Sequence, residues 1–278
     1  IYSISTSPLD KNIIWAGTDD GLVHVTLDGG KTWKNVTPPS LTSWDKISQI
    51  DAGHFDTQTA YVSVNAIRKD DQRPHIFKTH DSGATWSEIT TGMNASGPVN
   101  VVREDLKKQG LLYAGTEREV YFSIDDGANW QSLRLNMPAT SIRDLVVHEN
   151  DLVIGTHGRS IWILDDVSPL RGLASFIQNK NQVLFKPAQA TRVRFNMFSD
   201  TPLPIEEPAG QNPPDGAILD YALALRANEV KLEIEDLKGS VIRTFSSNDV
   251  HAALDSTSVQ HPMYWVRPPQ ALFVEPGH

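Results

Sequence analysis

The 278-residue chain contains no cysteine. Disulfide bonds and thiolate metal sites are therefore excluded, and the fold has to be stabilised by its hydrophobic core alone. The absence of cysteine fits an exported bacterial protein without demonstrating export. Hydrophobic residues make up 39% of the chain and charged residues 21%, which is typical of a globular protein with one large domain or two smaller ones.

Long apolar and long basic segments are also absent. No apolar run approaches the roughly 20 residues that cross a bilayer. The formal net charge is −9 and no run of Lys and Arg occurs, so a nucleic-acid role is excluded on electrostatic grounds. The aspartate pairs lack the spaced loop of oxygen ligands that holds Ca²⁺. The sequence therefore predicts neither a metal nor a cofactor.

Three copies of one short motif stand out. Each reads Ser/Thr-x-Asp-x-Gly-x-Thr/Asn-Trp, and the copies begin at Thr26, Thr79 and Ser123. The Asp side chain is expected to accept backbone N–H groups and close a tight turn, while the Gly supplies a positive φ. The Trp is expected to anchor the next strand in the core between repeats. The structural residues of the three turns are Asp28, Gly30, Trp33, Asp81, Gly83, Trp86, Asp125, Gly127 and Trp130.

Each motif belongs to a longer repeat. A short apolar strand ends in Gly-Thr, and a second strand leads into the motif, as in Ile13–Val25 and Leu111–Phe122. A further strand opens each repeat, and four short strands in roughly 45 residues are typical of a β-propeller blade. No amphipathic helix is expected. The predicted blades cover residues 1–46, 47–97, 98–140 and 141–172, the last with a degenerate motif.

The four blades predict an incomplete ring. Propellers usually have about 4–8 blades, and residue 1 lies in the middle of the pattern. Two open blade faces would expose more apolar area than a monomer usually shows. We therefore expect preceding blades, or another chain, to complete the propeller.

The composition changes after Leu170, and residues 173–278 are predicted to form a linker and an incomplete β-sandwich of immunoglobulin-like type. The Pro-rich segment Thr201–Gly216 excludes a helix or a central strand there. Leu237–Gly239 is expected to form a hairpin turn. The predicted strands are Val183–Pro187, Thr191–Phe195, Ala217–Leu225, Glu229–Asp236 and Ser240–Ser246.

The short motif resembles the Asp-box, or bacterial neuraminidase repeat, of sialidases, xyloglucan hydrolases, sortilin-type receptors and photosystem assembly factors. Leu111–Glu117, Thr156–Asp166 and Pro208–Ala217 are similar to a family of large secreted bacterial proteins labelled sortilin-like or glycosyl hydrolase. The resemblance covers nearly the whole chain. It implies an all-β fold and a secreted or periplasmic location, but no agreed catalytic residues. The chain departs from the pattern at Asn129, where Thr is usual, and in the fourth repeat.

In a fold of this kind the Asp-box turns lie opposite the end where ligands usually bind, so we assign them a structural role. The loops at the other end carry carboxylates, Arg and an aromatic residue, which are the groups that a sugar site needs. The catalytic candidates are Asp19, Asp20, Asp70, Asp71, Glu117 and His157. The expected ligand-binding residues are Trp44, Arg68, Arg73, Arg118 and Arg159.

These features leave three functions open. The first is a propeller module that recognises a glycan or a protein, and the second is a glycoside hydrolase with a carboxylate pair on the loop end. The third is a purely structural part of a cell-surface assembly. A sialidase is disfavoured, because Tyr61 and Tyr113 lie in apolar strands and are expected to be core residues. Two carboxyls about 5–9.5 Å apart in one cleft would favour hydrolysis.

Overall fold

The computed structural model describes residues 1–94, 97–179, 182–190, 204, 206, 210, 216–250, 257 and 271–277. The chain divides into two compact units, residues 1–174 and 175–278. Every candidate site residue named above belongs to the first unit.

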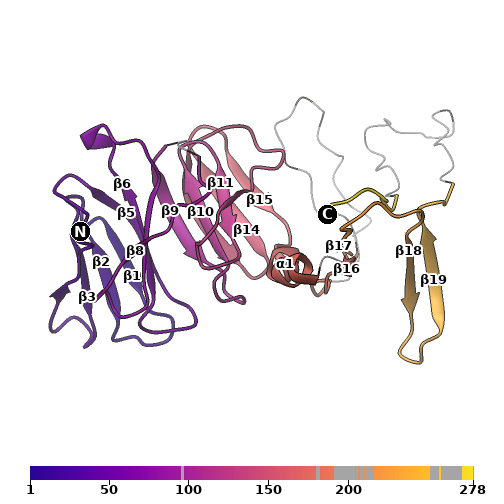
Figure 1. Ribbon diagram of the computed structural model, residues 1–278, viewed down its shortest axis with the longest axis horizontal. Helices are drawn as coiled ribbons and strands as arrows, with labels where there is room; N and C mark the ends of the chain where they lie inside the picture. The colour runs from indigo at the N-terminus through magenta and orange to yellow at the C-terminus, as the bar shows by residue number, and fades with distance from the viewer. Residues whose placement is uncertain are drawn as a thin grey trace. The chain divides into compact units, whose positions relative to one another are not determined.

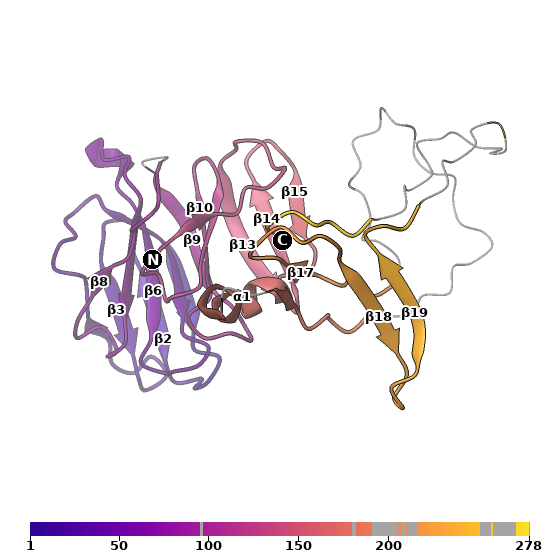
Figure 2. The same cartoon turned by 45° about the vertical axis from the view of Figure 1, so that its right-hand side comes forward.

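Four antiparallel sheets form the first unit, and each follows the order of the chain. Figures 1 and 2 show them side by side, from indigo to pink. The predicted all-β repeat is confirmed, while the number of blades in a complete ring stays a prediction. The strands of the first two sheets are β1 (Ser3–Thr6), β2 (Ile14–Gly17), β3 (Val23–Thr26), β4 (Lys34–Asn35), β5 (Lys46–Ala52), β6 (Ala60–Asn65), β7 (His75–Thr79) and β8 (Ser87–Glu88). Those of the next two are β9 (Val99–Glu104), β10 (Leu112–Thr116), β11 (Val120–Ser123), β12 (Gln131–Ser132), β13 (Ile142–His148), β14 (Asp151–Thr156) and β15 (Ile161–Leu164).

Apolar side chains fill the spaces between neighbouring sheets. Trp15, Ile47, Ile50 and Val62 are fully buried in one such cluster. The glycine that ends the second strand of a repeat permits this packing. A Cβ atom at Gly17 would collide with the Ile47 side chain of the next sheet. The Gly-Thr signal in the sequence therefore marks a point of close approach between blades.

The three predicted turns have the expected geometry. In the first, Asp28 accepts the backbone N–H of Thr32 at 2.9 Å and its hydroxyl at 2.7 Å. The Thr26 hydroxyl donates to Asp28 at 2.8 Å and accepts the N–H of Gly30 at 2.9 Å. Gly30 has a φ of 93°. The turns at Asp81 and Asp125 repeat these bonds, with Asn129 taking the place of Thr as donor.

The motif tryptophans reach back to the preceding sheet. The indole N–H of Trp86 donates to the Val36 carbonyl, and that of Trp130 donates to the Ile89 carbonyl, both at 2.7 Å. Trp130 is 3% exposed, as expected of an anchor between repeats. Trp33 is 43% exposed, which differs from the expectation. Among the described residues no sheet packs on this side of the first sheet, so the Trp33 indole lacks the contact that Trp86 and Trp130 make.

The fourth sheet has three strands within the described residues, and an α-helix, α1 (Ser168–Asn179), follows it. The expectation of no amphipathic helix is therefore wrong. Leu170 and Leu173, three residues apart, pack against the core cluster that contains Leu145. Arg171 donates three hydrogen bonds of 2.9–3.1 Å to the fully buried carboxylate of Asp105. An isolated helix of 12 residues is only marginally stable in water, so tertiary packing and this ion pair stabilise α1.

The described part of the second unit contains two strand pairs. Strand β16 (Val183–Leu184) pairs with β17 (Tyr221–Ala222), and β18 (Lys231–Glu235) pairs with β19 (Val241–Ser246). The turn predicted at Leu237–Gly239 joins the second pair. The strand predicted over Thr191–Phe195 and most of the Pro-rich segment lie outside the described residues. The sandwich stays a prediction.

Candidate functional site

The two ends of the sheets carry different loops. Strand β3 begins after the loop that contains Asp19 and ends at the turn that contains Asp28, so these two loops lie at opposite ends of the first sheet. We call the end with the three motif turns the box face and the other end the loop face. The loop face carries the short 3₁₀ helix η1 (Ile67–Lys69) and all the predicted catalytic and ligand-binding residues.

Trp44 is the most exposed aromatic side chain on the described loop face, with 62% of its surface open to solvent. Its φ is 81°. A bulky residue with a positive φ is a genuine backbone outlier, and such strain persists only where the surroundings over-determine it. The segment around Trp44 connects β4 of the first sheet with β5 of the second.

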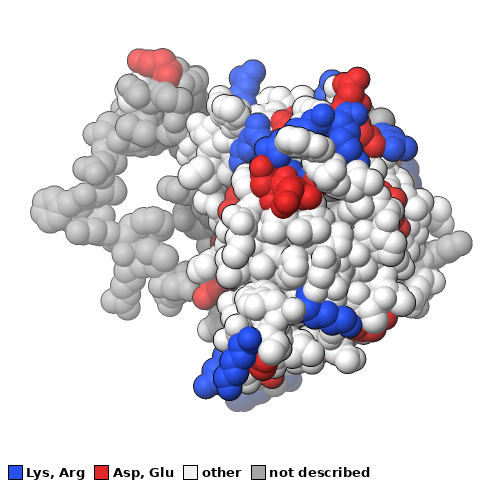
Figure 3. Space-filling view, turned by 90° about the vertical axis from the view of Figure 1, so that its left-hand side faces the viewer, with Lys and Arg blue, Asp and Glu red and all other residues white. Residues whose placement is uncertain are grey.

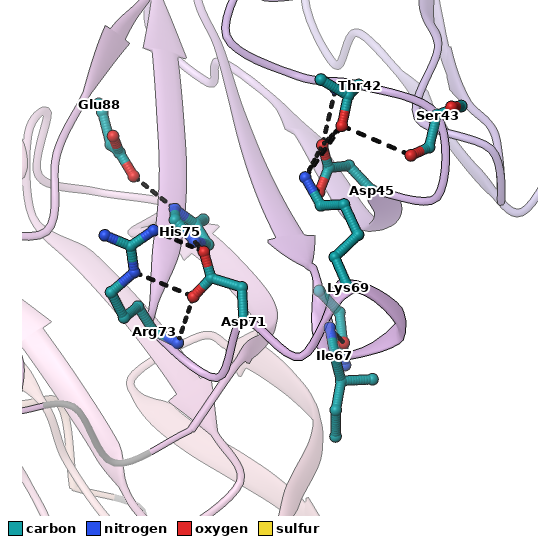
Figure 4. A network of polar contacts seen from close by, with 10 residues as sticks. Thr42, Ser43, Asp45, Ile67, Lys69, Asp71, Arg73, His75 and Glu88 are labelled. Atoms are coloured by element: carbon teal, nitrogen blue, oxygen red, sulfur yellow. Dashed lines mark hydrogen bonds and ion pairs between the residues drawn. The ribbon is translucent and has the colours of Figure 1, made fainter.

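Asp45 holds this segment in place. Its side chain is 3% exposed and accepts the Thr42 N–H at 2.7 Å and the Thr42 hydroxyl at 3.1 Å. The Lys69 ammonium of η1 lies 2.6 Å from Asp45 Oδ1, as Figure 4 shows. On the other side, a Cβ atom at Gly21 would come within 2.7 Å of the Thr42 carbonyl. Contacts from both neighbouring loops therefore fix the backbone that presents Trp44.

Arg68 and Asp19 form a bidentate ion pair between the first and second sheets. The guanidinium donates to the two carboxylate oxygens of Asp19 at 2.8 and 3.1 Å and to its carbonyl at 3.1 Å. The hydrogen bonds from Arg68 lower the pKa of Asp19. Both side chains are substantially exposed, so the pair contributes geometry more than stability.

A second polar group surrounds Asp71. Arg73 donates to its carboxylate at 2.6 and 3.0 Å, and His75 Nε2 lies 3.3 Å from it (Figure 4). His75 Nδ1 lies 2.6 Å from Glu88 on β8. The hydrogen bond from Arg73 lowers the pKa of Asp71 well below its usual range.

A third polar group joins two predicted residues, Glu117 and His157. Arg143 lies between them, 3.2 Å from Glu117 and 3.3 Å from His157 Nδ1. Asn100 also donates to Glu117 at 2.9 Å. Burial raises the pKa of Glu117, but the hydrogen bond from Asn100 and the charge of Arg143 act against it, and the net shift is downward.

The predicted residues thus form separate clusters, and each of the three carboxylates Asp19, Asp71 and Glu117 is held by its own arginine. The remaining predicted residues are exposed on the same face: Asp20, Asp70, Arg118 and Arg159. Sequence reasoning missed His75, Glu88, Asn100 and Arg143 as partners. His75 and Glu88 lie on adjacent strands, and only the register of those strands brings them together.

The outer face of the first sheet is a separate exposed surface. Ile4 of β1 is 63% exposed, and Trp33, directly before β4, is 43% exposed and occupies the repeat position from which Trp86 and Trp130 donate to the preceding sheet. Figure 3 shows this side of the molecule, with charged side chains gathered toward the upper and lower edges and a wide uncharged area between them.

Comparison with known proteins gives partial similarities. No family model matches the chain. An oligoxyloglucan-reducing end-specific xyloglucanase of Emericella nidulans is 24% identical over 108 residues, and a probable enzyme of the same name from Neosartorya fischeri is 28% identical over 106. Each match covers 37% of this chain and 13% of the relative. The chain therefore spans a small part of the relatives that it matches.

Solved structures with a similar fold include β-propellers. YCF48 bound to a D1 peptide has a TM-score of 0.47 and 20% identity, covering 59% of this chain and 51% of that one. The β-propeller domain of Myceliophteria thermophila Cps50 (Swd1) has a TM-score of 0.46 and 13% identity, with the same coverage.

The described residues offer no group of three or more His, Cys, Asp or Glu side chains that would hold a metal ion. Within the same residues, no helix has the length and apolar character required to cross a membrane.

Proposed function

We propose that this protein is a recognition module that binds a carbohydrate on its loop face, with Trp44 as the stacking platform. The observation that carries the proposal is the combination of exposure and backbone strain at Trp44. An indole face carries negative charge density, and the C–H face of a pyranose ring presents apolar, weakly positive hydrogens to it.

The surroundings of Trp44 support a binding role. A fixed aromatic group loses little conformational entropy when it binds, so clamping the segment through Asp45 and Lys69 favours affinity. The Asp19–Arg68 pair lies on the adjoining loops and offers hydrogen-bond donors and acceptors to sugar hydroxyls. The charged rim and the exposed indole together match the polar and aromatic groups of sugar sites.

The relatives favour a β-glucan ligand. Both sequence matches are named as xyloglucanases that act at the reducing end of oligoxyloglucan. Because such polysaccharides are met outside the cytoplasm, the proposal carries the expectation of a secreted or periplasmic protein.

Binding is favoured over hydrolysis on this face. A glycosidase needs a general acid whose pKa is raised toward neutrality. The pKa values of Asp19, Asp71 and Glu117 are all lowered by neighbouring donors and cations. Carboxyls held in their ionised form are suited to hydrogen bonding with a sugar and poorly suited to protonating a leaving group.

The direct test is a titration of the full chain with xyloglucan oligosaccharides by isothermal calorimetry. We expect Trp44→Ala to weaken binding at least tenfold and leave the denaturation midpoint unchanged. Leu135→Ala is the matched control, because Leu135 is also exposed at a positive φ in the corresponding loop after β12. Equal binding by the wild-type chain and Trp44→Ala would refute the role of Trp44.

We also infer that a further propeller blade covers the outer face of the first sheet. The support is the docking pattern inside the chain, in which Trp86 and Trp130 each donate to a carbonyl three residues beyond the preceding motif tryptophan. Trp33 presents the same donor to an open face. The acceptor is a backbone carbonyl that lies three residues after a motif tryptophan. The fourth sheet of a second copy of this chain would not supply it, because α1 follows β15 where the other repeats have the motif turn and a fourth strand.

Oxidative footprinting tests this partner. Trp33 is expected to be oxidised readily in the present chain and to be protected in a longer protein that carries additional blades. Trp44 serves as the internal reference, since it is expected to stay reactive in both. Oxidation of Trp33 at the same rate in both proteins would contradict the inference.

A further inference from the structure

A cavity of about 390 Å³ opens on the box face between the second and third sheets. A volume of this size falls within the range of small-molecule sites. The lining residues are Phe55, Asp56, Thr59, Tyr61, His80, Glu104, Gln109 and Asp126. None of them was among the residues that the sequence singled out for binding or catalysis.

The side chains that line the cavity are joined by hydrogen bonds. The Tyr61 hydroxyl donates to Asp126 Oδ1 at 2.7 Å, and Lys78 donates to Asp126 Oδ2 at 2.7 Å. His80 Nε2 lies 2.9 Å from the same oxygen, and its Nδ1 lies 2.8 Å from the Thr59 hydroxyl. Asp126 is therefore held by three neighbours.

Glu104 is less well satisfied. It is 2% exposed, and its Oε2 accepts the His54 N–H at 2.8 Å. Among the described residues, its Oε1 accepts hydrogen bonds from the Gly110 N–H at 3.4 Å and the Tyr61 hydroxyl at 3.5 Å and from no other group. Since the Tyr61 proton is already donated to Asp126 at a shorter distance, this oxygen has room for a strong donor from a ligand.

The full set of polar groups that lines this cavity is not repeated at the other junctions between sheets. Strand registers and motif positions identify the equivalent residues at the other junctions between sheets. Between the first and second sheets, the positions of Tyr61, Lys78, His80, Glu104 and Asp126 hold Trp15, Val25, Leu27, Ala52 and Ser82. Between the third and fourth sheets, the positions of Lys78, His80 and Glu104 hold Phe122, Ile124 and Val147. Uncharged side chains therefore occupy these positions at both neighbouring junctions. The position of Tyr61 holds Tyr113 at the second of them, where its hydroxyl donates to Asp105, a carboxylate already paired with Arg171.

The charge balance of the cluster favours a cation. Four carboxyls, those of Asp51, Asp56, Glu104 and Asp126, gather in or beside the cavity. Two permanent cations beside the cavity are already engaged, Lys78 with Asp126 and Arg103 with Asp51. A positive group that enters the cavity would reduce the remaining repulsion among the carboxyls.

We propose that this cavity binds a single small cationic group, an alkylammonium or a guanidinium, through Glu104 Oε1. Phe55 stands 39% exposed at the cavity and offers apolar contact to the stem of such a ligand. The site is independent of the carbohydrate site proposed above, because it lies on the opposite face.

Burial raises the pKa of Glu104, and the negative charge of Asp51 raises it further. The backbone hydrogen bonds from His54 and Gly110 lower it, but the net shift is upward. The groups that face it are Asp51, His54, Tyr61, Lys78, His80 and Asp126. A cation binds the ionised carboxylate and not the protonated acid. Affinity is therefore expected to rise as the pH rises through the raised pKa of Glu104 and then to level off.

The test uses calorimetric titration of the full chain with Nα-acetyl-lysine amide. Nα-acetyl-norleucine amide is the neutral probe of similar shape, and Nα-acetyl-arginine amide distinguishes guanidinium from ammonium. A lysine side chain keeps its charge below about pH 9, so the pH dependence between pH 5 and 8 reports on the protein. We expect one or both cationic probes to bind and the neutral probe to bind at least tenfold more weakly.

Glu104→Gln is expected to weaken the cationic probe at least tenfold without lowering the denaturation midpoint, because Gln still accepts the His54 N–H and removes a buried charge. A purely structural Glu104 would give the opposite result, a lower midpoint. Glu119→Gln is the matched control, since Glu119 also accepts a tyrosine hydroxyl, from Tyr121. Equal binding of neutral and cationic probes, no binding of any probe, or unchanged binding by Glu104→Gln would overturn the proposal.

Discussion

Replacement of each motif tryptophan by phenylalanine is expected to lower the free energy of unfolding where the tryptophan is a buried anchor, and to change it little where the tryptophan lies on an open surface. Trp130→Phe removes a 2.7 Å hydrogen bond to the Ile89 carbonyl from a side chain that is 3% exposed. An orphaned buried acceptor costs about 1–3 kcal/mol, and the smaller ring leaves a void that costs roughly 1 kcal/mol more. The expected loss of unfolding free energy is therefore about 2–4 kcal/mol.

Trp33→Phe is the internal comparison. Trp33 is 43% exposed, and no neighbouring sheet in the described part of the chain packs on it. Surface substitutions of this kind usually change stability by less than about 0.5 kcal/mol. Trp86→Phe should fall between the two, because its side chain is partly buried and its indole donates to the Val36 carbonyl.

Urea denaturation followed by circular dichroism measures all three variants. The midpoint should shift in the order Trp130, Trp86, Trp33, with an unchanged slope of free energy against urea concentration. A Trp33→Phe loss as large as that of Trp130→Phe would refute the reasoning. It would mean that the motif tryptophans stabilise their own turns and not the contact with the preceding sheet.

Three further predictions follow from other contacts. Arg171→Ala should destabilise the first unit by about 3–5 kcal/mol, because the carboxylate of Asp105 would be left buried without its partner; a loss below about 1 kcal/mol in urea denaturation would argue against the ion pair as the helix anchor. The hydrogen bonds from Thr32 and Thr85 lower the pKa values of Asp28 and Asp81 to about 2, so the stability that these turns contribute should be fully present above about pH 4 and disappear as the pH falls toward 2. In Asp81→Asn this acid-sensitive part should be smaller, and an unaltered pH profile would contradict the assignment. Gly83→Ala should lower the denaturation midpoint because a Cβ atom there comes within 2.6 Å of Val36 at a φ of 81°; Gly158→Ala, at a φ of 80° with open space around it, controls for backbone strain alone.

The geometry of the motif turns followed from sequence because it is local. Asp28 bonds to Thr26 and Thr32, and those contacts need no knowledge of other strands. The repeated strand pattern was likewise readable, because alternating burial and turn residues recur in every copy. The placement of the charged loops at one end of the sheets follows from the antiparallel order of the strands.

The sequence could not reveal which charges pair across the blades. Asp19 meets Arg68, and Asp45 meets Lys69, only because neighbouring sheets stack and their loops approach one another. Hydrogen bonds of this kind hold the carboxyls of Asp19, Asp71 and Glu117 and lower their pKa values. Helix α1 was missed for a similar reason, since its buried ion pair joins residues far apart in the chain.

The sequence by itself determined the turns, the strands and the blade repeat, because each depends on residues within a few positions of one another. Only the tertiary structure decided that Glu104, Tyr61 and Asp126 share one cavity and that Trp33 stands on an open face. Burial and pairing of this kind depend on how one sheet packs on the next. That packing joins residues about 40–65 positions apart, as Glu104 and Asp126 are each joined to Tyr61, and no local pattern encodes it.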